Sequence, residues 1–168
     1  MMLEPSRQAL NQLPVEDARS ILMTVCSATA WVDGMLSLRP FADQQALLAA
    51  SRAVWATTGE SDWLQAFGGH AKIGDRRALS ASNKTSTIRE QGQVRSSSEA
   101  LRTELDRLNQ LYEAKFGFIF IVCATGKSPE AMLEVLEAAL GADRRSELHR
   151  AAREQENIMA LRLGAWQS

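Results

Sequence analysis

The sequence is poor in the residues that build metal sites and disulfide frameworks. Its 168 residues include only two cysteines and two histidines. Cys26 and Cys123 stand far apart, and neither has a second cysteine or a histidine at the spacing of a metal-ligand pair. Both lie in apolar runs, so we expect two small buried side chains in a reducing compartment. The sequence gives no support for a zinc site or a disulfide-stabilised scaffold.

The sequence also lacks an excess of positive charge and any long apolar run. Lysine and arginine total 19 against 20 acidic residues, which gives a net charge of -1 and an isoelectric point near 6.1. Nucleic-acid-binding domains usually carry a basic surface, so nucleic acid is not expected as a partner. No segment approaches the roughly 18 apolar residues of a membrane span, and residues 1–7 lack the pattern of a signal peptide. We therefore predict a cytoplasmic protein with no membrane partner.

What is present is the composition of an ordinary globular protein. Apolar residues make up 45% of the chain and charged residues 23%. The length fits one domain, which we predict to span residues 1–168. Apolar residues recur at helical spacing through most of the chain. The predicted fold is all-α, a single-domain bundle of about eight helices with a buried extended connector.

Capping residues mark several of the expected helix starts. Ser6, Asp43 and Ser128 each precede an apolar stripe, and Ser61 or Asp62 is expected to cap the short helix that follows it. The expected helical segments cover residues 6–12, 14–25, 31–38, 43–56, 61–67, 86–91, 99–115, 128–140 and 143–163, approximately.

The connector is the segment Phe116–Ala124, the most apolar stretch of the chain. By propensity it is a buried strand, but a lone strand would leave its backbone hydrogen-bonding groups without partners. We interpret it as an extended or partly helical buried connector. Its backbone N–H and C=O groups then need other partners, and a bound polar ligand could supply some of them.

One of the two histidines lies in a glycine-flanked loop. His70 follows Gly68-Gly69 and precedes Ala71-Lys72-Ile73-Gly74, between two helical regions. Glycine permits a sharp bend or a close approach of the backbone to a ligand. An imidazole titrates near pH 6.5, so His70 is a candidate general acid or base. A histidine that caps a helix or faces water fits the local sequence equally well.

The last expected helix turns two polar side chains toward the core. Leu148, Ala151, Gln155, Ile158 and Arg162 follow one another at steps of three and four residues and therefore share one face. The apolar members mark this face as buried, so Gln155 and Arg162 should point inward. A buried guanidinium needs an anion or several acceptors. The structural alternatives are a salt bridge to a core carboxylate and an arginine that extends to solvent near the helix end.

Three further polar features have less specific interpretations. Glu90, taken alone, is a solvated acid in the first turn of a helix. His149 lies on the basic side of the last helix and is expected at the surface. Gly126-Lys127-Ser128 is similar to the end of a phosphate-binding loop, but the pattern requires glycine where Ile121 stands. We therefore interpret Gly126 as a turn residue before the Ser128 cap.

Five separated motifs nevertheless point to one family. They are Gly69-His70-Ala71-Lys72-Ile73-Gly74-Asp75, Thr87-Ile88-Arg89-Glu90-Gln91, Leu108-Asn109-x-x-Tyr112, Lys115-Phe116-Gly117-Phe118 and Leu161-Arg162-Leu163. Together and in this order they resemble the OHCU decarboxylase family, and the resemblance spans essentially the whole chain. The substrate of that family is 2-oxo-4-hydroxy-4-carboxy-5-ureidoimidazoline (OHCU).

The resemblance implies an all-helical, usually dimeric enzyme that needs no metal or organic cofactor. It implies decarboxylation of a small-molecule ureidoimidazoline to (S)-allantoin in urate degradation, carried out by a homodimer. It carries the catalytic residues over to His70, Glu90 and Arg162. We hypothesise that His70 is the general acid/base, that Glu90 orients the imidazole or a substrate N–H, and that Arg162 anchors the substrate. The expected substrate-binding residues are Ala71, Thr87, Gln91, Ile119, Phe120, Ile121, Val122 and Cys123.

The sequence departs from the family pattern at three positions. Ala71 replaces the usual proline and could loosen the loop, Lys72 replaces arginine, and Thr87 stands where serine is common. Two other functions fit the sequence less well. One is a helical binding module of the same fold without catalytic activity, and the other is a nucleotide-binding protein that uses Gly126-Lys127-Ser128.

Overall fold

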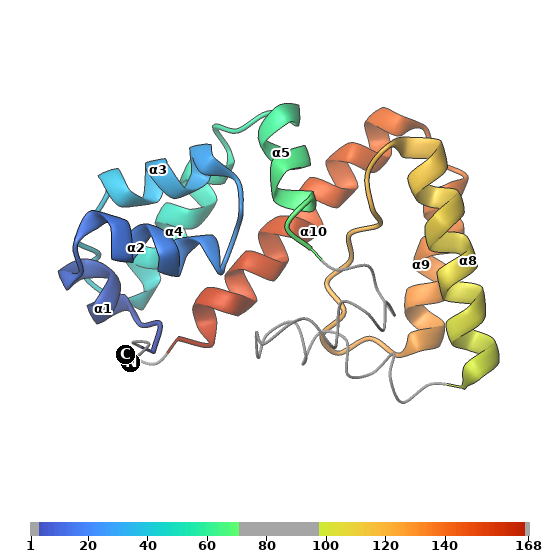
Figure 1. Cartoon of the computed structure of the whole chain (residues 1–168), viewed down its shortest axis with the longest axis horizontal. Coiled ribbons are helices and arrows are strands. Elements are labelled where there is room, and N and C mark those ends of the chain that lie inside the picture. Colours follow the sequence, from blue (N-terminus) through green and yellow to red (C-terminus); the bar gives the residue numbers. More distant parts are fainter. Residues whose placement is uncertain (1–3, 71–97, 167–168) are drawn as a thin grey trace. The chain divides into compact units, whose positions relative to one another are not determined.

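A computed structural model describes residues 4–70 and 98–166. This part of the chain forms eight helices and no strand, which confirms the predicted all-α fold (Figure 1). The helices are α1 (Arg7–Gln12), α2 (Val15–Met23), α3 (Thr29–Ser37), α4 (Gln44–Trp55), α5 (Glu60–Phe67), α8 (Glu99–Phe116), α9 (Pro129–Leu140) and α10 (Arg144–Gly164). None of these described helices is long and apolar enough to cross a membrane.

The chain divides into two compact units. The first contains residues 1–69 and 156–168, and the second contains residues 70–155. Helix α10 contributes residues to both, because the boundary falls after Gln155. The single domain of residues 1–168 stays a prediction.

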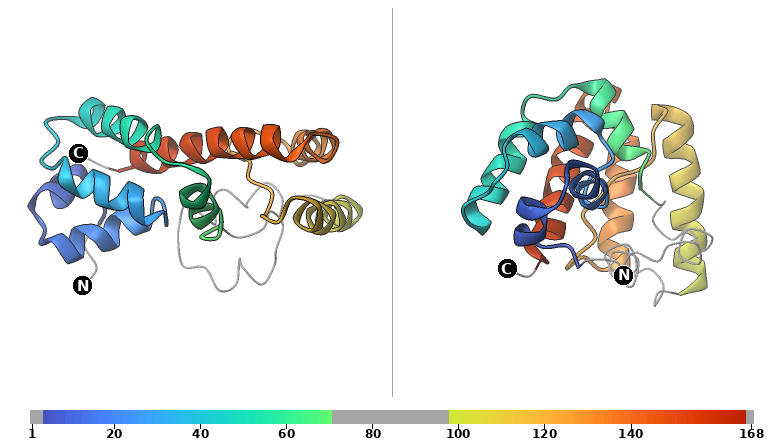
Figure 2. Two further views of the ribbon diagram at one scale, coloured as in Figure 1. Left: turned by 90° about the horizontal axis from the view of Figure 1, so that it is seen from above. Right: turned by 60° about the vertical axis from the view of Figure 1, so that its left-hand side comes forward.

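Helix α3 is the centre of the first unit. It packs against α2, α4 and α5, while α1 packs against α2 (Figures 1 and 2). Trp31, Val32 and Met35 of α3 are fully buried. The indole N–H of Trp31 donates a hydrogen bond to the main-chain oxygen of Ser51 at 3.3 Å, so the largest core side chain of α3 is also satisfied as a donor.

Three predicted helix starts are confirmed by their hydrogen bonds. The side chains of Ser6, Asp43 and Ser128 each accept from the backbone N–H three residues further on, at 3.0, 2.7 and 3.1 Å. Each of these bonds satisfies one of the N–H groups that a helix start leaves open. Local sequence alone was sufficient here, because both partners lie within one turn.

The start of α5 was predicted wrongly. The helix begins at Glu60, and its cap is Gly59 rather than Ser61 or Asp62. Asp62 lies inside the first turn, and its carboxylate accepts the N–H of Gly59 at 3.1 Å. A glycine has no side chain to mark it as a cap, so the sequence pattern pointed to the polar residues that follow.

The segment between α3 and α4 is fastened to α1 by polar side chains. Arg39 donates through Nη1 to the main-chain oxygens of Leu10 and Leu13, both at 2.8 Å. Asn11 pairs in both directions with the backbone of Phe41, at 2.9 and 2.8 Å. These contacts lie in partly buried surroundings and involve no carboxylate.

In the second unit, α8 and α9 lie side by side (Figure 1). The left-hand view of Figure 2 shows both nearly end-on, whereas the first part of α10 runs across the view. Two neighbouring residues, Leu111 and Tyr112, fit the helical spacing of the apolar stripe of α8. Tyr112 is buried and Leu111 is 48% exposed, so the tyrosine is the core residue. Its ring contacts those of Phe116, Phe118 and Phe120.

The connector after α8 is extended and buried. Gly117 ends α8 in the left-handed conformation at φ 84°, a backbone geometry that favours glycine. Phe118 and residues 120–124 are buried, and residues 119–124 form neither a helix nor a strand. Of the two predicted conformations, the extended one is therefore correct.

Candidate functional site

His70 follows a helix end that is held by side-chain hydrogen bonds. The hydroxyl of Ser27 donates to the main-chain oxygen of Gln65 near the end of α5, at 3.0 Å. The Gln65 side chain accepts the N–H of Thr29 at 3.0 Å and donates to the Thr29 hydroxyl at 2.8 Å. These bonds fix the last turn of α5, from which the chain continues to His70.

The backbone at Gly69, directly before His70, packs closely against Ser27. A Cβ atom placed on Gly69 would collide with both side-chain atoms of Ser27. This position therefore requires glycine for lack of space, since no positive φ is involved. The sequence predicted that the flanking glycines permit a sharp bend or a close approach to a ligand, whereas the close approach observed at Gly69 is to Ser27.

The imidazole of His70 meets an amide from α10. Its Nε2 lies 2.6 Å from Oε1 of Gln155, and the His70 side chain is half-buried. Gln155 is fully buried, as its place on the apolar face of α10 predicted. The contact itself was not predicted, because 85 residues separate the two.

The other polar atom of the Gln155 side chain is the amide nitrogen Nε2. It is buried and makes no hydrogen bond with the described residues. A buried donor left open costs about 1–3 kcal/mol. Such exceptions are few in native proteins and call for an explanation at the site where they occur.

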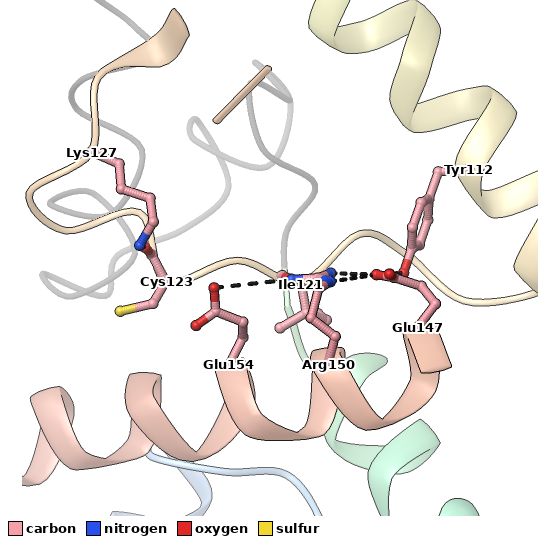
Figure 3. A network of polar contacts seen from close by, with 7 residues as sticks. All are labelled: Tyr112, Ile121, Cys123, Lys127, Glu147, Arg150 and Glu154. Carbon is pink, nitrogen blue, oxygen red and sulfur yellow. Dashed lines mark hydrogen bonds and ion pairs between the residues drawn. The ribbon is translucent and has the colours of Figure 1, made fainter. Parts of the chain in front are cut away.

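Two cationic side chains bind backbone oxygens of the connector residues that were assigned to substrate binding. Arg150 of α10 donates through Nη2 to the main-chain oxygen of Ile121 at 2.9 Å. The Lys127 ammonium donates to the main-chain oxygen of Cys123, also at 2.9 Å (Figure 3). The predicted need for backbone partners is thus met, at these two carbonyls, by cationic side chains of the chain itself.

A buried network fixes the arginine that binds the connector. Glu147 is 1% exposed and accepts through Oε1 from the Tyr112 hydroxyl and from Nε of Arg150, both at 2.7 Å (Figure 3). Glu154 adds a longer ion pair to Arg150 at 3.9 Å. The guanidinium also lies over the Phe120 ring, 4.9 Å from its centroid. Tyr112, Glu147 and Arg150 therefore form one hydrogen-bonded network that anchors the connector to α10.

The network keeps its members in defined protonation states. Burial is the main cause that raises the pKa of Tyr112, and the hydrogen bond to Glu147 raises it further. Burial alone would lower the pKa of Arg150, but the hydrogen bond and charge of Glu147 outweigh this and raise it. The phenol therefore stays a donor and the guanidinium stays charged at neutral pH.

Arg162 finds a main-chain partner in the first unit. It is half-buried and donates through Nη1 to the oxygen of Val25 at 3.0 Å. The partner in this contact is a main-chain oxygen, which accepts one hydrogen bond from the guanidinium fork.

Four of the predicted site residues lie outside the described residues. These are Ala71, Thr87, Glu90 and Gln91. The roles assigned to them stay predictions. His70 and residues 119–123 belong to the second unit, and Arg162 belongs to the first.

Sequence reasoning missed Glu147 and Arg150. They stand three positions apart in a helix that carries many charges, so nothing in the pattern separates them from solvated neighbours. Tyr112 gave the only signal. A tyrosine on a buried stripe requires a partner for its hydroxyl, although the stripe does not say which one.

Two other predicted features behave as local structure. The Lys127 ammonium is occupied by Cys123 of its own loop, and Gly126 adopts φ 80°, in agreement with a turn. His149 is exposed, as predicted. Within residues 4–70 and 98–166, no group of three or more His, Cys, Asp or Glu side chains is arranged to hold a metal ion.

Comparison with known proteins identifies one family. The family model for OHCU decarboxylase matches residues 11–164. The chain is 32% identical over 142 residues to the uric acid degradation bifunctional protein TTL of Arabidopsis thaliana, covering 82% of this chain and 44% of that protein. It is 23% identical over 163 residues to the 2-oxo-4-hydroxy-4-carboxy-5-ureidoimidazoline decarboxylase of Haloferax volcanii, covering 96% of both. The chain thus spans less than half of the Arabidopsis relative.

Solved structures show the same fold. A crystal structure of OHCU decarboxylase in the presence of (S)-allantoin matches with a TM-score of 0.72 and 30% identity, over 84% of this chain and 93% of that one. A crystal structure of (S)-allantoin synthase matches with a TM-score of 0.70 over 96% of this chain and 54% of that one. Its identity is 17%, so this second match bears on the fold alone.

Proposed function

The chain belongs to the OHCU decarboxylase family, and from this premise we propose that it converts OHCU to (S)-allantoin with release of carbon dioxide. The observation that carries the proposal is the family match over residues 11–164, which includes His70 and Arg162. The Haloferax relative, named for this decarboxylase activity, covers 96% of the chain. The two bifunctional relatives, from Arabidopsis thaliana and Bacillus subtilis, are both named for uric acid degradation.

The reaction requires stabilisation of the charge left when the carboxylate departs. Fixed hydrogen bonds and positive charge can delocalise it into the adjacent imine and carbonyl system. His70 acts as the general acid/base, at the substrate hydroxyl and at the carbon that receives the new proton. Delivery of that proton from one face yields the (S) product. Glu90 orients the imidazole or a substrate N–H.

Arg162 anchors an anionic or carbonyl oxygen of the substrate. An arginine that grips only the departing carboxylate favours the ground state, so its best target is an oxygen whose charge grows in the transition state. Its hydrogen bond to the main-chain oxygen of Val25 supports this role because it orients the guanidinium. Arg162→Lys is expected to be severely impaired, since an ammonium cannot reproduce a planar fork.

The remaining pocket residues are Ala71, Thr87, Gln91 and the backbone of Ile119–Cys123. The binding of Ile121 by Arg150 supports the last assignment, because a ligand that recognises backbone groups needs them held in place. The enzyme works as a cytoplasmic homodimer without a metal or organic cofactor, in line with the family resemblance.

The test couples urate oxidation and hydroxyisourate hydrolysis to this protein and follows the optical activity of (S)-allantoin. The wild-type chain is expected to form it faster than the spontaneous reaction. His70→Ala should lose about 10²–10⁴-fold of the rate, the usual contribution of a general acid/base. His149→Ala is the matched control, because it removes the other, exposed histidine.

Circular dichroism of both variants separates loss of chemistry from loss of fold. Full activity in a folded His70→Ala variant contradicts the assignment of His70. A wild-type chain that does not accelerate the reaction contradicts the proposed function and leaves a helical binding module of the same fold.

A further inference from the structure

The contact between His70 and Gln155 defines the chemistry of the histidine more closely than its place in a loop does. Ring Nε2 and amide Oε1 are 2.6 Å apart, which is a short hydrogen bond. The amide is fully buried on α10, so water does not compete for it from that side. A short hydrogen bond to a fixed, buried amide restricts the rotation of the half-buried imidazole about both of its side-chain torsions.

The direction of the bond follows from the two groups. An amide oxygen only accepts hydrogen bonds, so the imidazole nitrogen that faces it must carry a proton. This holds for the neutral ring and for the imidazolium alike. The second nitrogen, Nδ1, is then the one that differs between the two states.

We infer that Gln155 is a positioning residue that holds the His70 ring with a proton on Nε2, so that Nδ1 is the nitrogen that takes up and returns protons. The inference deepens the proposed decarboxylase function and rests on it for its catalytic consequence. It assigns to Gln155 a role that acts through His70 and defines the ring atom that faces the substrate.

The uncharged amide suits this role better than a carboxylate would. A carboxylate at the same place would favour the imidazolium by its charge, whereas an amide orients the ring and adds no net charge. The Nε2 of Gln155, which has no hydrogen-bond partner among residues 4–70 and 98–166, supports the same conclusion. An amide that is fully buried with a donor unused among the described residues is costly for packing alone, so its contact with His70 accounts for it.

Nuclear magnetic resonance of the imidazole nitrogens tests the inference without substrate. The chain has two histidines, so a long-range proton–nitrogen correlation spectrum of ¹⁵N-labelled protein contains two ring patterns. His149→Gln removes one and assigns the other. At a pH where both rings are neutral, His70 is expected to show a protonated Nε2 and an unprotonated Nδ1.

Substitutions of Gln155 connect the ring pattern to activity. Gln155→Leu keeps the buried place apolar and filled but removes the acceptor. His70 should then show an averaged pattern, and kcat should fall about 10- to 100-fold, a part of the general acid/base contribution, with little change in KM. Gln155→Glu keeps an acceptor at this position and should retain the protonated Nε2. Arg153→Gln, at an exposed position of the same helix, is the control and should change neither readout.

Two results overturn the inference. One is a wild-type ring with its proton on Nδ1, and the other is a folded Gln155→Leu variant with an unchanged ring pattern and unchanged kcat. Failure of the proposed function gives a different result. In that case the wild-type chain forms no (S)-allantoin above the spontaneous rate, while the ring pattern, which is measured without substrate, still decides whether Gln155 holds His70.

Discussion

In the first unit, the segment between α3 and α4 is held by Arg39 and Asn11, whose partners are backbone groups. In the second unit, the connector is held by Arg150, which binds the Ile121 oxygen and is itself paired with the buried Glu147. Both units thus fasten an irregular segment with an arginine. Only the second adds a counter-charge that is almost completely removed from water.

The difference follows from burial. A partly exposed guanidinium keeps part of its hydration and can bind carbonyls alone, whereas a buried one needs a compensating anion. The compensated arrangement is rigid, because each member fixes the next. Removal of one member is also costly, because it leaves the others buried without their partner.

Loss of Glu147 is expected to have the largest effect. Glu147→Ala leaves the Arg150 charge and the Tyr112 hydroxyl without the acceptor they share. Breaking a buried ion pair from one side costs about 3–5 kcal/mol, and the partial exposure of Arg150 places the expected loss near the lower value. Urea unfolding followed by circular dichroism measures it.

A double substitution separates the cost of leaving the Arg150 charge unpaired from the loss of its attraction to Glu147. The double variant Glu147→Leu with Arg150→Met removes both charges and should recover part of the stability, since apolar replacements of buried pairs are often neutral. Its kcat/KM should nevertheless stay low because the connector has lost its anchor. If Glu147→Ala costs less than about 1 kcal/mol, the pair behaves as a surface pair and the contrast between the units is broken.

The second prediction concerns alkaline pH. Tyr112 is the only tyrosine of the chain, and its pKa is raised in the folded protein above the value near 10 of an unfolded chain. Its protonated form therefore contributes stability that is complete below about pH 10 and is lost as the pH rises toward the folded pKa. Phenolate absorbance should thus remain absent through pH 10 while the helices are intact and appear together with unfolding.

The same titration in concentrated urea is the reference. Phenolate absorbance should appear there near pH 10, the usual pKa of a tyrosine. Phenolate that forms near pH 10 without any change in circular dichroism would show that the hydroxyl is not enclosed by the network.

The third prediction applies to the first unit. Asn11→Ala removes both hydrogen bonds to Phe41 and should cost about 1–2 kcal/mol, because water can replace part of what is lost. Urea unfolding again provides the value. A loss as large as that of Glu147→Ala would mean that a neutral amide and a buried ion pair fasten their segments equally strongly.

The smallest effect is expected at a surface ion pair. Arg19 and Asp33 are 2.7 Å apart, with side chains 34% and 54% exposed. Arg19→Ala should cost less than about 1 kcal/mol, and the difference from wild type should shrink in concentrated salt. A larger, salt-independent cost would indicate that arginines of the first unit are as dependent on their carboxylates as Arg150 is.

Sequence reasoning succeeded where both partners of an interaction lie within one helical turn or one periodic stripe. The caps Ser6, Asp43 and Ser128 and the inward Gln155 all belong to this class. It could not pair Gln155 with His70 or Glu147 with Tyr112, because a pattern shows that a buried polar group needs a partner and does not identify it. The assignments of Glu90 and Arg162 came from the family motifs, and local spacing alone would have left both with ordinary structural roles.

Gly69 has a consequence for engineering the chain. Because a side chain at this position would occupy the space of Ser27, the two positions have to be varied together. A library randomised at position 69 alone should return almost only glycine, whereas one that also allows glycine at position 27 should admit alanine. Gly69, the residue next to the proposed acid/base, thus limits which substitutions are possible at position 27 and at its own position, and the limit is steric.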